Sequence, residues 1–312
     1  MGFVIRYFRI PLTMPFRGVT ERAGALLEGG SGWGEFSPFP DYGPETTARW
    51  YEAAREAAFG NWPAPVRERV EVNATIPAVS PERAHAITAS SGCRTAKVKV
   101  GDDGDEARVE AVRAALGPSG RLRVDANGAW DVDAAERAIA RLARFDLEFV
   151  EQPVGSLAEM AELRKRVEVP LAADESVRTA EDPLRIAGLE AADIVVLKVQ
   201  PLGGVRRALQ VAEAAGLAAV VSSAVETSIG IAAGVALAAA LPELPYACGL
   251  GTVTLLKGDV VRDPLVPAEG WLPVRKPTVD EEALARYEVT GATAQELSAR
   301  LAAAAARAGV PA

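Results

Sequence analysis

Three acidic residues close consecutive strand-like runs of this sequence. Asp125 ends RVD, Glu151 ends FVE and Asp174 ends LAAD, at intervals of 26 and 23 residues. Three carboxylates gathered away from water would repel one another unless a cation neutralised them. Oxygen ligation without histidine or cysteine favours Mg²⁺, with Mn²⁺ as an alternative. The acids therefore predict a metal site, although acids that cap helices or pair with arginines would give the same spacing.

Lysine is scarce, and three lysines fall near these acids. Lys97 and Lys99 alternate with valines in TAKVKV, so in a strand both point the same way. Two ammonium groups about 6.6 Å apart repel by about 2.5 kcal/mol, enough to lower the pKa of one lysine toward that of a working base. Lys198, in DIVVLKVQ, follows Asp174 by 24 residues. Solvated charge on an edge strand is the alternative for the lysine pair. The 34 basic residues include six lysines, at positions 97, 99, 165, 198, 257 and 276.

These groups together suit one kind of reaction. A cation that holds a carboxylate stabilises the enediolate formed when the neighbouring carbon loses a proton, and a lysine accepts that proton. We therefore expect a small-molecule carboxylate substrate. The expected metal ligands are Asp125, Glu151 and Asp174, and the expected catalytic residues are Lys97, Lys99 and Lys198.

The spacing of these residues implies a barrel. Short β-rich runs alternate with helical stretches, and the runs start about 23 to 28 residues apart. Eight such units close a (β/α)8-type barrel, in which the carboxyl ends of the strands surround one mouth. A doubly wound open sheet is the competitor, but no glycine-rich phosphate turn follows the first strand. The runs are 70–77, 95–100, 121–127, 147–153, 170–174, 193–199, 218–223 and 246–251.

The segments on either side of this repeat have a different sequence pattern. The first part mixes strand-like GALLEGG and GWGEFSPF with an amphipathic helix, PETTARWYEAAREAAF, and an alanine-rich helix is expected at 293–308. Residues 80–82 and 179–182 resemble helix starts. We expect an α/β fold in which a (β/α)7β-type TIM barrel spans 70–264. An α+β capping domain is formed by residues 1–69 and by the tail 265–312, which returns to it.

Composition limits the partners and the compartment. The net charge of −8 argues against nucleic acid or an anionic membrane as a partner. No uncharged apolar run reaches the roughly 20 residues of a membrane span, and the first residues lack the pattern of a signal peptide. The two cysteines, Cys93 and Cys248, are far apart, which fits a reducing compartment. We expect a cytoplasmic protein, and the sequence does not specify its oligomeric state.

The motifs resemble those of the enolase superfamily. KVK, VDAN, EQP, ADES and LKVQPLGG are similar to its muconate lactonizing branch, because lysines flank the acids on both sides and His85 is the single histidine. Within that branch, GWGEFSPFPDYGPET, SSAVETSIGIAAG and ELPYACGLGT look most like o-succinylbenzoate synthases of menaquinone biosynthesis. The resemblance implies a lyase that dehydrates 2-succinyl-6-hydroxy-2,4-cyclohexadiene-1-carboxylate to o-succinylbenzoate.

The resemblance also implies roles for the lysines. Lys99 would take the α-proton and then protonate the departing hydroxide, while Lys97 would adjust the basicity of Lys99. Lys198 would stabilise the enediolate as a cation, whereas in racemizing relatives the equivalent lysine is a second acid/base. The segment PLTMPFRGVTERAG is similar to a mobile lid of the superfamily, with a plain surface loop as the alternative.

Further residues are candidates for the surroundings of the site. Asn127 and Glu175 follow ligand positions and would orient the acids or a bound water, or serve ordinary turns. Arg123 points inward with Asp125, either toward substrate or toward a carboxylate below it. Candidates for binding the succinyl carboxylate are Ser222, Ser223, Gly249 and Gly251, with simple loop geometry as the alternative.

Two other functions compete with the synthase. An N-succinylamino acid racemase or dipeptide epimerase of the same branch would keep every metal ligand and all three lysines. A barrel that has lost catalysis and serves as a binding scaffold is the rival from another class.

Overall fold

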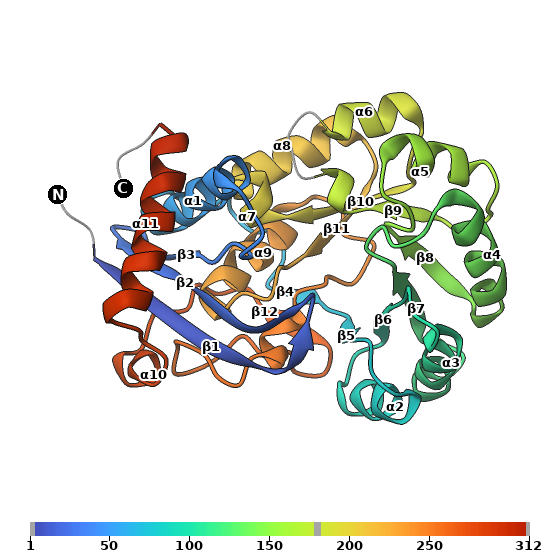
Figure 1. Ribbon diagram of the computed structural model, residues 1–312, viewed down its shortest axis with the longest axis horizontal. Coiled ribbons are helices and arrows are strands. Elements are labelled where there is room, and N and C mark those ends of the chain that lie inside the picture. The colour runs from blue at the N-terminus through green and yellow to red at the C-terminus, as the bar shows by residue number, and fades with distance from the viewer. Residues whose placement is uncertain (1–3, 178–181, 310–312) are drawn as a thin grey trace.

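Seven parallel strands form the central sheet of the protein (Figure 1). The computed structural model describes residues 4–177 and 182–309. The strands lie side by side in their sequence order, as in a barrel built from repeated strand and helix units. Their interiors are apolar and rich in valine, which suits strands covered on both faces. They are β5 (Ala74–Ile76), β6 (Thr95–Lys99), β7 (Arg121–Asp125), β8 (Leu147–Glu151), β9 (Leu171–Ala173), β10 (Ile194–Lys198) and β11 (Ala218–Ser222).

The segment 246–251 joins the two edges of this sheet. Gly249 bridges to Ser222 at the end of β11, and Cys248 bridges to Val72, just before β5. The predicted barrel is therefore confirmed, and an open sheet is excluded. The expectation of a full strand at 246–251 is wrong, because these two bridged residues are its extended part. A run with two glycines offers few side chains to pack, and a 3-10 helix (Gly251–Leu255) follows at once.

The run 70–77, predicted as one strand, is divided between two sheets. Residues Arg69–Glu71 form β4, which pairs antiparallel with β12 (Trp271–Pro273), while β5 belongs to the barrel. The division falls at Asn73, whose side-chain amide donates to the carbonyl of Ala74 at 3.1 Å. A side chain that hydrogen-bonds the neighbouring backbone competes with a continuous ladder.

Helices cover the outside of the barrel (Figure 1). The start expected at residues 80–82 is confirmed, because the Ser80 hydroxyl accepts from the Arg83 N–H at the first turn of the helix that follows. The capping box that Ser156 forms with Glu159 was not among the helix starts predicted from the sequence. The helix start expected at 179–182 lies outside the described residues, apart from Asp182 itself. The helices are α2 (Pro81–Ser90), α3 (Asp105–Leu116), α4 (Val132–Leu142), α5 (Leu157–Arg164), α6 (Asp182–Leu189), α7 (Val199–Leu202), α8 (Val205–Ala215) and α9 (Ser228–Ala240).

A second layer stands beside the barrel. Strands β1 (Ile5–Phe16), β2 (Val19–Gly29) and β3 (Gly32–Phe36) form an antiparallel sheet, and α1 (Pro44–Phe59) packs on it. After the short α10 (Glu281–Ala285), α11 (Gly291–Arg307) packs against α1 and β2. We call β1–β3, α1 and α11 the capping layer. The division at residues 69 and 264 stays a prediction.

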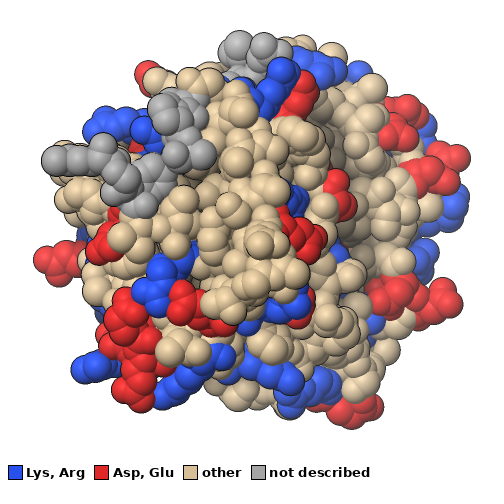
Figure 2. Space-filling view, turned by 60° about the vertical axis from the view of Figure 1, so that its left-hand side comes forward, with Lys and Arg blue, Asp and Glu red and all other residues tan. Residues whose placement is uncertain are grey.

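The hydropathy of the helices and the charge of the surface bear on the expected partners. No helix within the described residues is long and apolar enough to cross a membrane. On the face shown in Figure 2, basic and acidic side chains are interspersed, and the described residues visible there form no continuous basic patch. This charge pattern gives no support to a polyanionic partner on that face.

Candidate active site

The three predicted acids lie together at the mouth of the barrel. Asp125 ends β7, Glu151 ends β8 and Asp174 follows β9 directly. Asp125 and Glu151 are direct partners in the ladder between their strands, and all three acids are at most 3% exposed. The parallel register thus gathers carboxylates that are far apart in sequence, as the spacing predicted.

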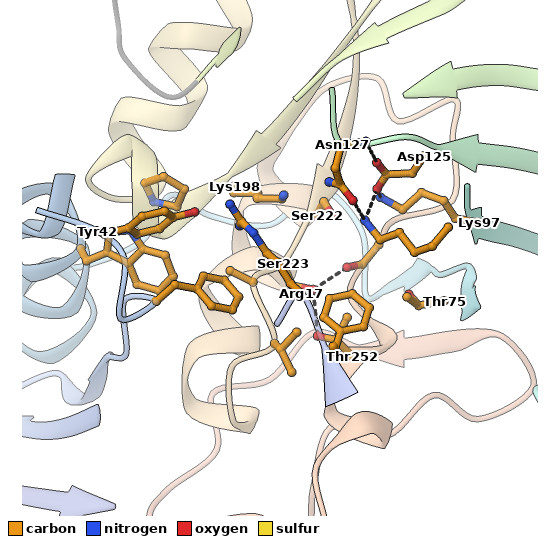
Figure 3. A pocket seen from close by; sticks show the side chains of 18 residues that line it. Arg17, Tyr42, Thr75, Lys97, Asp125, Asn127, Lys198, Ser222, Ser223 and Thr252 are labelled. Carbon is orange, nitrogen blue, oxygen red and sulfur yellow. Dashed lines mark hydrogen bonds and ion pairs between the residues drawn. The ribbon is translucent and has the colours of Figure 1, made fainter. Parts of the chain in front are cut away.

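The three lysines contact these acids from two sides of the mouth. The Lys97 ammonium lies 2.6 Å from Glu151 and 3.0 Å from Asp125, and that of Lys99 lies 2.5 Å from Asp125. From β10, on the far side of the mouth, the Lys198 ammonium lies 2.5 Å from Asp174. Figure 3 shows Lys198 separated from Lys97 and Asp125. The site therefore carries ammonium groups on both sides of the acids.

The electrostatics of Lys97 do not match the lowered pKa expected for one lysine of the pair. Burial disfavours the charge on Lys97, but Asp125 and Glu151 outweigh burial and raise the pKa of this lysine. The expected repulsion between Lys97 and Lys99 is weaker than the attraction of Lys97 to these two carboxylates, which the spacing of the lysines alone does not indicate. Likewise, burial opposes the charge on Lys198 while Asp174 raises its pKa. Lys97 therefore does not fit the expectation of a lysine with a lowered pKa.

The acids respond unequally to the same surroundings. Burial favours the neutral form of Asp125, but Lys97 and Lys99 hold the pKa of this carboxyl well below its usual range. Burial, reinforced by repulsion from Asp125, raises the pKa of Glu151 to about 8. An additional positive charge in the cluster would thus be most strongly favoured beside Glu151.

The donor set is compatible with a divalent cation. Within the described residues, no three acidic, histidine or cysteine side chains are close enough to enclose an ion directly. The ammonium group of Lys97 separates two of the carboxylates and is bonded to both. A positively charged group, the Lys97 ammonium, therefore already lies between Asp125 and Glu151. Carboxylate oxygens without sulfur or imidazole are the ligands of hard cations such as Mg²⁺.

A pocket opens above the lysines. The space between its lining atoms is about 600 Å³, which includes open solvent. The barrel contributes Lys97, Lys99, Asp125 and Lys198 to its lining. The opposite wall comes from the capping layer and from the loops between its elements: Phe16, Arg17, Phe39, Tyr42 and Trp50. Both layers are therefore needed to form the pocket.

The structure brings most of the secondary candidates to this site. Asn127 accepts from the Lys99 ammonium at 2.6 Å and donates to Glu175 at 3.2 Å. Ser222, Ser223 and Gly249 line the pocket. A Cβ on Gly249 would lie 2.6 Å from the Ser222 hydroxyl oxygen, so only glycine allows this close approach.

Two candidates lie elsewhere. Arg123 is fully buried below the mouth, where it pairs with Glu148 at 2.5 Å and donates to the carbonyl of Ala247 at 2.7 Å. It therefore pairs with a carboxylate, the second of the two expected uses. Gly251 does not line the pocket, because the chain turns into a 3-10 helix at that residue. Neither is brought into contact with the pocket.

The capping side of the pocket was missed in the sequence. Phe39 and Tyr42 belong to GWGEFSPFPDYGPET, which attracted notice for its resemblance but not as a pocket wall. Arg300 of α11 holds that segment by donating to the carbonyls of Pro38 and Tyr42, both at 3.1 Å. Thr75, another missed residue, was detectable because it lies on the first strand of the repeat.

The segment expected as a lid or a surface loop forms a hairpin. It comprises the end of β1, a turn at Arg17 and Gly18, and the start of β2. Arg17 has a φ of 49°, and Gly18 has a φ of 75°. The hairpin turn places Arg17 in the pocket wall. Its mobility stays a prediction.

The fold and this arrangement of acids and lysines are those of an enolase-type enzyme. The family model described as enolase N-terminal domain-like matches residues 7–58, and that described as enolase C-terminal domain-like matches residues 80–278. Enolase superfamily members generally use a divalent metal. The class expected from the motifs is thereby confirmed.

The particular family follows from curated relatives. The chain is 64% identical to the o-succinylbenzoate synthase of Thermobifida fusca, over 96% of this chain and 95% of the relative. It is 50% identical to the o-succinylbenzoate synthase of Mycolicibacterium smegmatis, over 88% of this chain and 87% of the relative. The protein belongs to the o-succinylbenzoate synthase family.

A solved structure agrees on the fold. The muconate lactonizing enzyme from Pseudomonas fluorescens superposes with a TM-score of 0.81 and 24% identity, over 92% of this chain and 98% of the other. At that identity the likeness concerns the fold alone. It confirms the barrel with its capping layer.

Proposed function

We propose that this protein is a lyase that dehydrates 2-succinyl-6-hydroxy-2,4-cyclohexadiene-1-carboxylate to o-succinylbenzoate in menaquinone biosynthesis. Membership of the synthase family supports the reaction. One observation carries the mechanism: three buried acids at consecutive strand ends lie between lysines of β6 and β10. Loss of water turns the existing cyclohexadiene ring into an aromatic one, which makes the dehydration favourable. The enzyme therefore has to lower the barrier to removing an unreactive proton.

The lysines divide the proton chemistry between them. Lys99, as a neutral amine, accepts the proton from the carbon next to the ring carboxylate. The resulting ammonium returns that proton to the departing hydroxyl, which leaves as water from the same face of the ring. Lys97, held by Asp125 and Glu151, supplies fixed positive charge beside the base. One base thus serves both proton transfers, and no net proton is gained or lost.

Asp125, Glu151 and Asp174 would hold a divalent cation, which we propose is Mg²⁺, with Mn²⁺ as an alternative. Bound there, the cation would offset the negative charge that develops on the substrate carboxylate as the proton leaves. Asn127 and Glu175 are placed to orient the neighbouring groups, since Asn127 links Lys99 to Glu175.

Turnover assays with purified protein test the proposed function. We expect rapid conversion of the cyclohexadiene substrate and at most slow racemization of N-succinylamino acids or epimerization of dipeptides. Efficient racemization with the cyclohexadiene substrate left untouched would contradict the synthase assignment. Absence of turnover on all of these substrates would favour the scaffold alternative.

Substituting Lys198 tests whether it acts as a cation or as a proton carrier. We expect Lys198→Arg to be about tenfold or more faster than Lys198→Ala, because arginine keeps the charge but does not release its proton near neutral pH. The comparison uses kcat for both variants under identical metal and pH conditions. Equal rates for the two variants would assign Lys198 to proton transfer.

Arg17 is placed to bind the second carboxylate of the substrate. Its guanidinium lies over the rings of Phe39 and Tyr42, with centroids 4.8 and 5.5 Å away, and Figure 3 shows its side chain among those of the pocket. Within the described residues, no carboxylate forms an ion pair with Arg17, whereas each pocket lysine has such a pair. With the ring carboxylate bound at the proposed cation, the succinyl carboxylate would be left for Arg17, which lines the pocket together with Ser222 and Ser223.

Arg17→Met is expected to weaken substrate binding more than chemistry. We expect KM to rise by about tenfold to a hundredfold with a smaller change in kcat, as for loss of a charge-assisted hydrogen bond. Calorimetry with o-succinylbenzoate and with its analogue esterified on the succinyl carboxylate gives a second measure. Wild-type protein should prefer the free acid, and Arg17→Met should lose that preference. An unchanged preference would exclude this contact.

A cytoplasmic location stays a proposal, supported by the two unpaired cysteines. The partner expected for the pocket is the small carboxylate substrate.

A further inference from the structure

The loop between β11 and α9 forms part of the pocket and contains a strained residue. Val225 lines the pocket, is 2% exposed and has a φ of 61°. A β-branched residue at positive φ is an outlier, because its side chain crowds the backbone. Packing explains the choice of valine, since its side chain belongs to an apolar cluster with Phe8, Ile10 and Leu255. Other contacts must hold this backbone in place.

The capping layer supplies one of those contacts through Arg22 of β2. The Nε of Arg22 donates to the carbonyl of Val225 at 3.1 Å, and a second nitrogen donates to the carbonyl of Ser37. Its guanidinium also lies over the ring of Phe39, 4.1 Å from the centroid. Arg22 is 2% exposed, so these contacts are made away from water, where they are strong.

Neighbouring acids hold the rest of the loop. Glu35 of β3 accepts from the N–H of Thr227 at 3.1 Å and from that of Gly230 at 3.0 Å. The Glu226 side chain accepts from the N–H of Ala224 at 2.7 Å. These bonds fix the loop on either side of Val225, but Arg22 is the residue that joins it to Phe39, on the opposite wall of the pocket.

We propose that Arg22 is a positioning residue for substrate binding. By holding the strained Val225 carbonyl and the ring of Phe39 together, it sets the separation between the barrel wall and the capping wall of the pocket. The lysines and acids make their own contacts at the strand ends and do not depend on Arg22. This inference rests on the proposed function for its kinetic readout alone.

Arg22→Met separates this role from catalysis. We expect KM for the cyclohexadiene substrate to rise about tenfold while kcat stays within about twofold, because binding geometry is lost and the base is retained. Arg22→Lys should fall between, since lysine keeps a charged donor but lacks the planar guanidinium that lies over the Phe39 ring. The matched control is Arg9→Met, which removes an exposed arginine of the same sheet that pairs with Glu21 and should change neither constant.

Substitution of Val225 tests the strain directly. In the Arg22→Met background, Val225→Gly and Val225→Ala both remove packing, but only glycine accepts positive φ without strain. We expect the glycine variant to recover most of the lost affinity and the alanine variant to recover none. Equal behaviour of the two would overturn the proposal, as would a wild-type KM for Arg22→Met.

Hydrogen exchange gives a readout that does not require turnover. In Arg22→Met, the amides of residues 223–230 should exchange faster while those of β6 to β8 stay protected. Uniformly faster exchange would mean that Arg22 only stabilises the fold, and would refute the positioning role. If wild-type protein failed to convert the substrate, the proposed function would fail, and this exchange pattern would still decide the role of Arg22.

Discussion

Lys99→Ala is expected to lose about 10³-fold or more in kcat while the fold is retained. General acid–base catalysis contributes about 10²- to 10⁴-fold, and here one group performs both proton transfers. The side chain is 20% exposed at the pocket, so its truncation leaves no large cavity in the core. Asp125 keeps the ammonium of Lys97 as a partner after the change. Steady-state assays with thermal unfolding of the same samples measure both effects.

Two controls make this result specific to the base. Lys99→Arg keeps the charge but not the ability to act as a base near neutral pH, so it should be as inactive as the alanine variant. Lys165→Ala removes an exposed lysine next to α5 and should behave as wild type. Substantial activity in Lys99→Arg would show that position 99 contributes charge and not proton transfer.

Removal of divalent cations is expected to abolish turnover, with loss of at least about 10³-fold. Three buried carboxylates among lysines bind the reacting carboxylate poorly without added positive charge, because like charges repel in a water-poor site. Activity should return with added Mg²⁺ or Mn²⁺ and should not return with a monovalent salt of equal ionic strength. Exhaustive treatment with EDTA, then titration of each ion, measures this dependence.

The variant Asp174→Asn serves as the matched test of the ligands. It should need a much higher Mg²⁺ concentration for half-maximal activity, and calorimetry should show the weaker ion binding independently of turnover. Full activity after EDTA treatment would remove the cation from the mechanism. Unchanged Mg²⁺ dependence in Asp174→Asn would exclude Asp174 as a ligand.

The barrel and the centre of the site were predictable because both follow from a short repeat. Strands at regular intervals, each ending in an acid, leave few arrangements in which Asp125, Glu151 and Asp174 do not meet. The alternation of side chains likewise placed Lys97 and Lys99 on one face, and both contact Asp125. Local rules sufficed for these residues.

The remaining parts depend on contacts between distant segments. The resemblance of residues 11–24 to a lid directed attention to the segment that contains Arg17 and Arg22, but no local pattern assigns a role to either side chain. Arg22 meets Val225, which is more than two hundred residues away. The direction of the pKa shift at Lys97 was not predictable for the same reason, since it depends on two acids from other strands. The length of the eighth strand depends on how the two edges of the barrel sheet approach each other, and the hydrophobic pattern of the sequence does not indicate this.

The closure of the ring by so few residues has a thermodynamic consequence. Strands β10 and β11 share five paired positions, whereas Ser222 and Gly249 form an isolated pair between β11 and the closing segment. The contact between β11 and the closing segment therefore opens locally at a lower free energy than the pairing of β10 with β11. Both residues also line the pocket, so a ligand that touches them binds the closed ring in preference to the open one. Substrate binding and closure of the barrel are then linked equilibria. A bound substrate lowers the population of molecules in which the pair Ser222 and Gly249 is separated.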